Sequence, residues 1–211
     1  MIQLSNLAGK PVLIAHQVLE SMTTGPRPTR SEVSDIHNSI MNGVDALVLS
    51  SETATGLNPI STIQMLSKII FEAEKETNYP EFQQRLMKMC PKPQPTSESI
   101  ASSSVSCARK TNASLIVCLT ELGGTAKLVA KYRPEIPVIG ATKVATTARQ
   151  LNMCFGVKPY YVEGEVDLLK KVIDYAVGLG LVKRGEIVVV TSGQVIGFAE
   201  GTTTKMQVVI A

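Results

Sequence analysis

The strongest constraint on the fold is an alternation of short apolar runs with amphipathic stretches along almost the whole chain. Two early runs, PVLIA at 11–15 and DALVLS at 45–50, have the length and composition of buried strands. Later segments continue the pattern with SLIVCLT, IPVIGAT, GVKPYYV, GEIVVVTSG and KMQVVI. Strands that alternate with helices are typical of βα units around a parallel sheet, so we predict an α/β protein. A loop of about ten residues joins the last two strands, which lets them pair antiparallel.

Local signals mark two helix starts in the first part of the chain. Thr29 and Glu32 have the spacing of a capping box, and the apolar residues that follow share one helical face. Gly43 is a natural end for that helix. Asn58 and Pro59 mark the next start, because proline is favoured at the first helical position. Further helices are expected near 97–111, 124–132 and 165–180, with another beginning near 144.

Composition argues against several functional classes. The chain has 211 residues, of which 44% are hydrophobic and 18% charged, as in an ordinary globular protein of one or two domains. A net charge of +3 with scattered basic residues argues against nucleic-acid binding. Four cysteines and two histidines show no zinc-ligand spacing, and the free thiols fit a reducing compartment. Without a secretion signal or an apolar run of roughly 20 residues, we expect a cytoplasmic protein that does not cross a membrane.

A proline-rich segment, CPKPQPTSES at 90–99, interrupts the helical periodicity and is the best candidate for a domain boundary. The α/β alternation starts again after it. We therefore expect two structural units on either side of this segment.

Three predicted strand ends are polar, and ligands in parallel α/β folds bind at such ends. Their sequences are AHQVLESM, SSETATG and TELGGTA. In the third, Gly123 and Gly124 open a helix whose free N–H groups suit a phosphate, and Thr120 and Thr125 add hydroxyl donors. Each segment can equally be an ordinary turn between strand and helix, in which Ser and Thr cap the helix. The residues alone thus lead to an α/β protein with a possible anion site.

Longer stretches resemble a known family. NLAGKPVLIAHQVLESM, GPRPTRSEVSD and NGVDALVLSSETATGLNP follow, in order and spacing, the last part of the pyruvate kinase barrel. The segments from SIASSSVSCARK to IPVIGAT, together with TARQL and GLVKRGEIVVVTSG, are similar to the C-terminal regulatory domain of the same family. The resemblance covers essentially the whole chain.

The resemblance implies a specific architecture and activity. Residues 1–88 would be the last two βα units of a (β/α)8 barrel, and residues 89–211 a five-stranded α/β C-terminal domain that binds effectors and mediates oligomerisation. The family transfers a phosphoryl group between phosphoenolpyruvate and ADP in glycolysis, with Mg²⁺ and usually K⁺. It is usually an allosteric tetramer, so a homo-oligomer is implied.

The resemblance also assigns site residues. Ser50 corresponds to the strand-end serine of the family's SGETA motif, where a hydroxyl helps to relay a proton to the enolate. Glu52 corresponds to the glutamate of that motif and would shape the turn. The segments TELGGTA and SGQVIGFAEGTTT (192–204) would face each other around a phosphorylated sugar effector, with Thr120, Gly123, Gly124 and Thr125 as the phosphate contacts.

Several positions depart from the family pattern. His16 stands where the family has a threonine close to the substrate carboxylate, Ser51 replaces a glycine, and Thr55 occupies a position that is often lysine. Glu121 places a negative charge beside the expected effector phosphate. The family's catalytic lysine and the ligands of Mg²⁺ and K⁺ correspond to sequence upstream of this region, so we expect no metal ligand here, and Met1 could be an internal methionine.

Two functions follow from this resemblance. The first is the C-terminal portion of a pyruvate kinase, inactive as an isolated chain because the lysine and the metal ligands are missing. The second is a truncated relative that acts as a regulatory or assembly module without catalysis. His16 favours the second function, whereas Ser50, Glu52 and the PRPTR segment favour the first.

Overall fold

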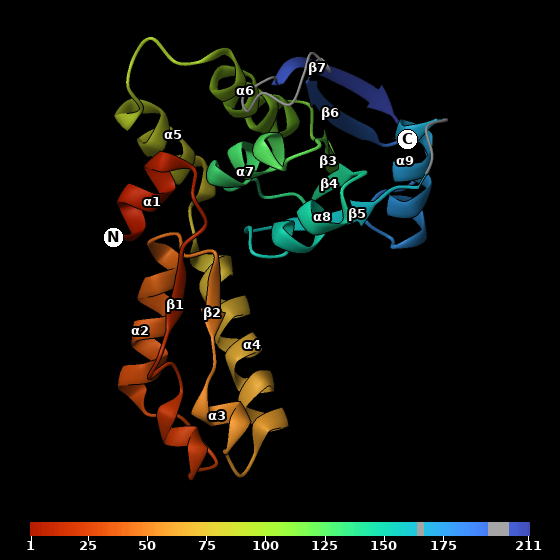
Figure 1. The fold of residues 1–211 in the computed structure, drawn as a ribbon. Coiled ribbons are helices and arrows are strands. Elements are labelled where there is room, and N and C mark those ends of the chain that lie inside the picture. Colours follow the sequence, from red (N-terminus) through yellow and green to blue (C-terminus); the bar gives the residue numbers. More distant parts are fainter. Residues whose placement is uncertain (164–166, 194–202) are drawn as a thin grey trace. The chain divides into compact units, whose positions relative to one another are not determined.

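The computed structural model describes residues 1–163, 167–193 and 203–211 (Figure 1). These residues form two compact units, Met1–Asn78 and Tyr79–Ala211. Each unit has an apolar core of its own. No helix in the described parts of the chain is long and apolar enough to cross a membrane.

The first unit contains two strands with helices alongside them. In chain order its elements are α1 (Ile2–Ala8), β1 (Leu13–Ala15), the 3-10 helix η1 (Glu20–Thr23), α2 (Arg30–Met41), β2 (Ala46–Val48), α3 (Ser51–Ala54) and α4 (Pro59–Glu76). The strands are parallel, with Leu13 opposite Ala46 and Ala15 opposite Val48. They are shorter than the apolar runs that predicted them, and both end in exposed residues.

Both predicted helix starts in this unit are confirmed. The Thr29 hydroxyl accepts the N–H of Glu32, and the Glu32 carboxylate accepts the N–H of Thr29, which completes the capping box. Pro59 is the first residue of α4, after Asn58. The core of the unit is a small apolar cluster of Val18, Leu19, Met22, Ile36 and Leu66. Two of its members come from α2 and α4, which explains the apolar face of each helix.

The second unit is built on a five-stranded sheet in the order β5-β4-β3-β6-β7. Its elements are α5 (Tyr79–Met89), α6 (Thr96–Lys110), β3 (Leu115–Leu119), α7 (Gly124–Lys131), β4 (Val138–Thr142), α8 (Ala145–Leu151), β5 (Val157–Tyr161), α9 (Leu168–Gly178), β6 (Ile187–Gly193) and β7 (Thr203–Ile210). The first four strands in this order are parallel, and β7 pairs antiparallel with β6. The predicted five-stranded α/β domain with an antiparallel last strand is therefore confirmed.

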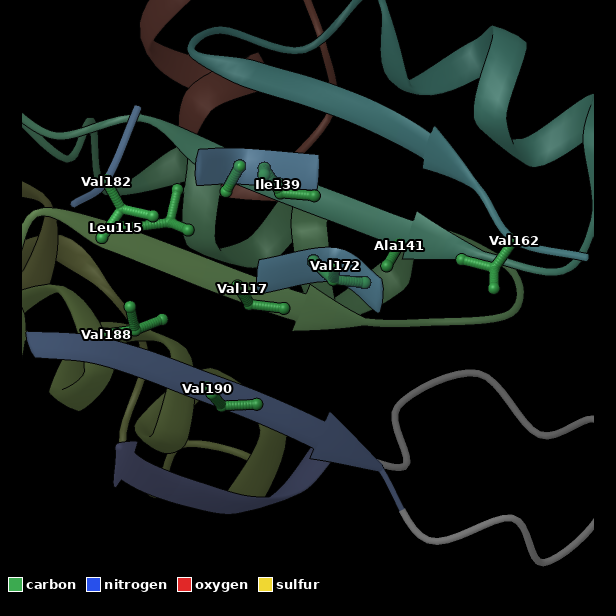
Figure 2. Packing of buried hydrophobic residues seen from close by; sticks show 10 residues of the cluster. Leu115, Val117, Ile139, Ala141, Val162, Val172, Val182, Val188 and Val190 are labelled. Atoms are coloured by element: carbon green, nitrogen blue, oxygen red, sulfur yellow. The ribbon is translucent and has the colours of Figure 1, made fainter. Parts of the chain in front are cut away.

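Alternate residues of the central strands face a core on one side of the sheet. Figure 2 shows Leu115 and Val117 of β3 beside Ile139 and Ala141 of β4, with Val172 of α9 close to them. The intervening residues Ile116 and Cys118 are also fully buried. Because both faces of these strands are covered, their sequences are almost continuously apolar rather than alternating.

Helix α5 belongs to the second compact unit. The Gln83 side chain is 1% exposed, and its Nε2 donates to the carbonyl oxygen of Ser102 in α6 at 3.1 Å. The Arg109 guanidinium donates to Oε1 of the same glutamine. The boundary between the two units therefore falls between Asn78 and Tyr79 in the sequence, ahead of the proline-rich segment. The family-domain limits of 1–88 and 89–211 stay a prediction.

Candidate functional site

The loop after β1 and the turn after β2 are joined by one buried carboxylate. Glu52 lies in the first turn of α3 and is 1% exposed. Its Oε1 accepts the backbone N–H of Leu19 at 3.1 Å, and its Oε2 accepts the backbone N–H of Ser50 at 2.7 Å. The Ser50 hydroxyl lies 3.3 Å from the same Oε2. Glu52 therefore holds the two strand ends against each other.

Hydrogen bonds keep Glu52 charged in spite of its burial. Burial by itself would raise the pKa of this carboxyl, because a buried charge loses its hydration. Four hydrogen bonds outweigh the effect of burial: three from the backbone N–H groups of Ser50, Glu52 itself and Leu19, and one from the Ser50 hydroxyl. The pKa of Glu52 therefore lies below its ordinary value of 4.5. At neutral pH Glu52 is thus an acceptor of hydrogen bonds and holds no proton to donate.

A second carboxylate fixes the far part of the same loop. Glu32 accepts the backbone N–H of Ser21 at 2.8 Å as well as the Ser21 hydroxyl. It also accepts the N–H and the hydroxyl of Thr29, at 2.7 and 2.8 Å. Burial opposes the charge here too, but these bonds hold the pKa of Glu32 below its ordinary value. The link to Ser21 was not predicted, because the capping-box motif accounts only for the contacts with Thr29.

Ser50 and His16 lie at the same edge of the strand pair. Parallel pairing of Ala15 with Val48 brings the carboxyl ends of β1 and β2 together. His16 follows β1 directly, is exposed, and has a left-handed φ of 70°. Ser50 follows β2 and is also exposed. This edge, with Glu52 beneath it, is where parallel α/β folds bind ligands.

In the second unit, the four predicted phosphate contacts lie where β3 leads into α7. The Thr120 hydroxyl accepts the N–H of Gly123 at 3.0 Å. Gly123 has a φ of 83°, which residues with a side chain rarely adopt. Gly124 is exposed at the start of the helix, with open space where a Cβ would stand. Thr125 is buried, and its hydroxyl is 2.6 Å from that of Thr203 in β7. The first N–H groups of α7 are therefore presented beside two hydroxyls.

The remainder of the expected effector loop is outside the described residues. Of 192–204, Ser192 and Gly193 end β6, and Thr203 and Thr204 begin β7. No group of three or more His, Cys, Asp or Glu side chains gathers into a possible metal site within 1–163, 167–193 and 203–211.

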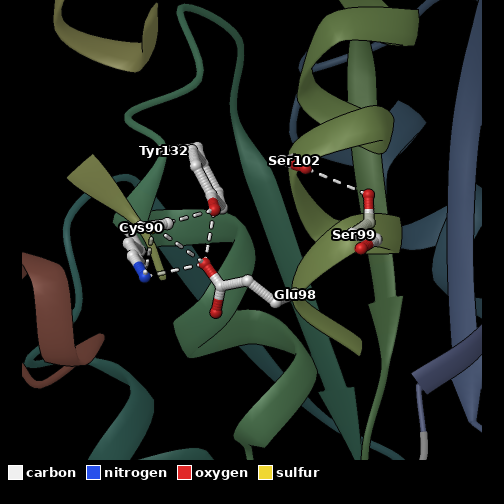
Figure 3. Close-up of polar contacts among 6 residues, drawn as sticks. Cys90, Glu98, Ser99, Ser102 and Tyr132 are labelled. Carbon is white, nitrogen blue, oxygen red and sulfur yellow. Dashed lines mark hydrogen bonds and ion pairs between the residues drawn. The ribbon is translucent and has the colours of Figure 1, made fainter. Parts of the chain in front are cut away.

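A polar cluster at the end of α7 was missed from sequence. Glu98 Oε1 accepts hydrogen bonds from Lys131 Nζ, at 2.7 Å, and from the Tyr132 hydroxyl, and Cys90 lies beside these groups (Figure 3). Cys90 and Glu98 stand at the two ends of the proline-rich segment, so the cluster attaches both ends to α7. Its members are up to 42 positions apart in sequence, and no local motif links them.

Comparison with protein families gives two matches along the chain. The model described as "Pyruvate kinase, alpha/beta domain" matches residues 98–209, and the model described as "Pyruvate kinase, barrel domain" matches residues 1–63. The first match covers more than half of the chain.

Individual relatives agree with the family matches. The chain is 38% identical over 218 aligned positions to pyruvate kinase 2 of Candida glabrata, which covers 99% of this chain and 43% of that protein. It is 40% identical to the pyruvate kinase of Clostridium acetobutylicum, with 99% and 44% of the two chains covered. The crystal structure of a pyruvate kinase from Cryptosporidium parvum superposes with a TM-score of 0.89 at 34% identity, over 99% of this chain and 41% of that one. The chain thus spans about two fifths of the length of these relatives.

Proposed function

This chain belongs to the pyruvate kinase family, and on that premise we propose that it forms the C-terminal part of an enzyme that transfers a phosphoryl group from phosphoenolpyruvate to ADP. The products are pyruvate and ATP. The observation that carries the proposal is the strand edge that holds His16 and Ser50, with Ser50 bonded to the buried Glu52. The chain around this edge matches the two family models at residues 1–63 and 98–209.

Ser50 takes part in the proton step. Loss of the phosphoryl group leaves the enolate of pyruvate, whose methylene carbon must gain a proton to become a methyl group. The exposed Ser50 hydroxyl can pass a proton to that carbon and regain one from solvent. Glu52 positions this hydroxyl and the backbone around it through its bonds to Ser50 and Leu19. Its low pKa suits this positioning role better than a role as a proton donor.

The ligands of Mg²⁺ and K⁺ would lie outside this chain. Among the described residues no three His, Cys, Asp or Glu side chains gather into one group, and both oxygens of Glu52 are already engaged by backbone N–H groups. The cationic stabilisation that phosphoryl transfer requires would come from the barrel segment that the longer relatives possess. The isolated chain is therefore inactive.

The second unit would serve regulation and assembly in the same enzyme. The start of α7, with Thr120, Gly124 and Thr125, is the place for the phosphate of a phosphorylated sugar. The family's tetramer is the model for a homo-oligomer of the complete protein, and a glycolytic role places it in the cytoplasm.

The test is a pair of activity assays with phosphoenolpyruvate, ADP, Mg²⁺ and K⁺ that follow pyruvate. The isolated chain should show no turnover above a buffer control. A chimera in which the preceding barrel segment of the Clostridium acetobutylicum relative is joined to this chain should turn over. Turnover by the repurified isolated chain would contradict the proposal that the upstream barrel segment supplies the metal ligands and the catalytic lysine. A folded but inactive chimera would contradict the enzymatic function.

The alternative function is a regulatory or assembly module without catalysis, and His16 is the observation that favours it. A bulky imidazole in a left-handed backbone conformation replaces a small hydroxyl of the family at the same edge as Ser50. A folded chimera that binds partners or effectors but stays inactive even with threonine at position 16 would support this alternative.

A further inference from the structure

Cys90 and Lys131 form an amine–thiol pair that phosphoryl transfer does not use. Lys131 Nζ lies 3.5 Å from Cys90 Sγ and 2.7 Å from Glu98 Oε1. The Tyr132 hydroxyl lies 3.8 Å from the same sulfur (Figure 3). All four groups belong to the second unit.

The pair is enclosed by protein. Cys90 and Lys131 are both 6% exposed, and Tyr132 is fully buried. The Lys131 ammonium is neutralised by Glu98, whose side chain is 12% exposed. Enclosure limits the approach of large thiols, such as glutathione, to the Cys90 sulfur. The Lys131 amine therefore stays the nearest nitrogen nucleophile to that sulfur. A small oxidant that reaches this sulfur therefore creates an electrophile beside a nitrogen nucleophile.

We propose that Cys90 and Lys131 are a site of oxidative crosslinking, at which a peroxide produces a covalent sulfur–nitrogen bond. In the first step the Cys90 sulfur attacks the peroxide, a sulfur–oxygen bond forms, the peroxide bond breaks, and water leaves. Cys90 is now a sulfenic acid, with its sulfur oxidised and the peroxide oxygen reduced. Glu98 accepts a proton from the Lys131 ammonium, which frees the nitrogen lone pair.

In the second step the Lys131 nitrogen attacks the Cys90 sulfur. The nitrogen–sulfur bond forms as the sulfur–oxygen bond breaks, and the hydroxyl leaves as water with a proton from the amine. The product is a sulfenamide between residues 90 and 131. An added thiol reverses it by attack on the sulfur, which releases the amine and then the free Cys90.

Two of the other three cysteines serve as internal comparisons for this site. Burial raises the pKa of the Cys118 thiol to about 12, which keeps it protonated and unreactive, and a hydrogen bond with Thr191 only partly opposes this. Cys107 is more exposed than Cys90. Its oxidation therefore measures how strongly a cysteine reacts with peroxide through solvent access alone. The crosslink ties the start of the proline-rich segment to the end of α7, where the same cluster already holds it without covalent bonds.

The experiment is peptide mass spectrometry on the whole purified chain after treatment with hydrogen peroxide. Free thiols are blocked under denaturing conditions before trypsin digestion. The crosslink should join peptide 89–109, in which Cys107 carries the blocking group, to peptide 128–143, because modified Lys131 resists cleavage. Its mass should lie about 2 Da below the sum of these two peptides. Fragment ions should place the link at Cys90 and leave Cys107 outside it.

Two variants separate the crosslink from simple oxidation. Lys131→Arg keeps the positive charge for Glu98 but has no amine that condenses with a sulfenic acid, so the linked peptide should vanish and Cys90 should become labelled by dimedone. Lys127→Arg, a matched change on the same helix, should retain the link. Dithiothreitol should remove the link from the wild type.

Two results would overturn the proposal. One is oxidation of Cys90 in the wild type to a dimedone-reactive or sulfinic form with no link to Lys131. The other is an unmodified Cys90 at peroxide concentrations that oxidise Cys107.

Discussion

The carboxylate of Glu52 accepts the backbone N–H of Leu19 at 3.1 Å, across 33 positions of sequence, while its other oxygen accepts the N–H of Ser50. One buried charge thereby couples the loop after β1 to the turn after β2. The catalytic assignment of Ser50 depends on this coupling, because the two bonds hold the turn that carries Ser50 against the loop after β1.

We expect Glu52→Gln to destabilise the first unit by about 1–3 kcal/mol at pH 7, because the amide nitrogen cannot accept one of the two buried N–H groups. The exposed Glu72→Gln is the matched control and should change stability far less. Urea unfolding of both variants and the wild type measures the effect.

The difference should also depend on pH. The pKa of Glu52 is lowered in the folded state, so its stabilisation is present above the unfolded-state pKa, near 4.5, and is lost as the pH falls through the folded-state pKa. The stability gap between wild type and Glu52→Gln should therefore shrink below pH 4.5. A gap that stays constant down to the folded-state pKa would mean that the charge is not what stabilises the turn.

His16→Thr should raise turnover and at the same time lower stability. In the active chimera the smaller hydroxyl should raise turnover, by up to about 10²-fold if the imidazole displaces the substrate by about 1 Å. Threonine is β-branched, and at a φ of 70° it should cost about 1–2 kcal/mol of stability. His37→Thr, at a partly exposed histidine paired with Glu76, is the control that should change neither activity nor substrate affinity. Equal turnover of the chimera with and without His16→Thr would show that the imidazole is harmless.

Effector binding should be weak in the wild type and improved by Glu121→Lys. Glu121 is exposed at the β3–α7 turn and repels a phosphate at the start of α7. Replacing that repulsion with a cation should tighten fructose bisphosphate binding by roughly tenfold or more. Calorimetry on the wild type, Glu121→Lys and the remote Glu72→Lys tests the prediction. Tight binding by the wild type that the lysine does not improve would contradict the charge argument.

Hydrogen exchange on the isolated chain should protect residues 100–211 more strongly than residues 1–88. The first unit has a two-stranded ladder of three residue pairs, with partly exposed side chains along both strands. The central strands β3 and β4 of the second unit are almost entirely buried and are paired on both sides. Few buried contacts allow local opening at low free-energy cost. Equal protection in a monomer would contradict this expectation.

Local signals predicted local structure well. The spacing of Thr29 and Glu32 is sufficient to define the start of α2, because the capping box is complete within four consecutive residues. The Glu98–Lys131 pair could not be predicted in this way, because it forms only when the C-terminal end of α7 packs against the proline-rich segment. For the same reason the bond from Glu52 to Leu19 had no sequence signature, although the motif around Ser50 indicated a functional turn.

The most direct test of the account is the turnover of the active chimera with and without the Ser50 hydroxyl. Ser50→Ala should lower turnover by about 10²–10⁴-fold with little change in stability, because it removes a proton-relay group from an exposed position. Ser61→Ala, at an exposed serine of α4, should leave turnover unchanged. Full activity in the folded Ser50→Ala chimera would contradict the assignment of this strand edge as the place where the enolate is protonated.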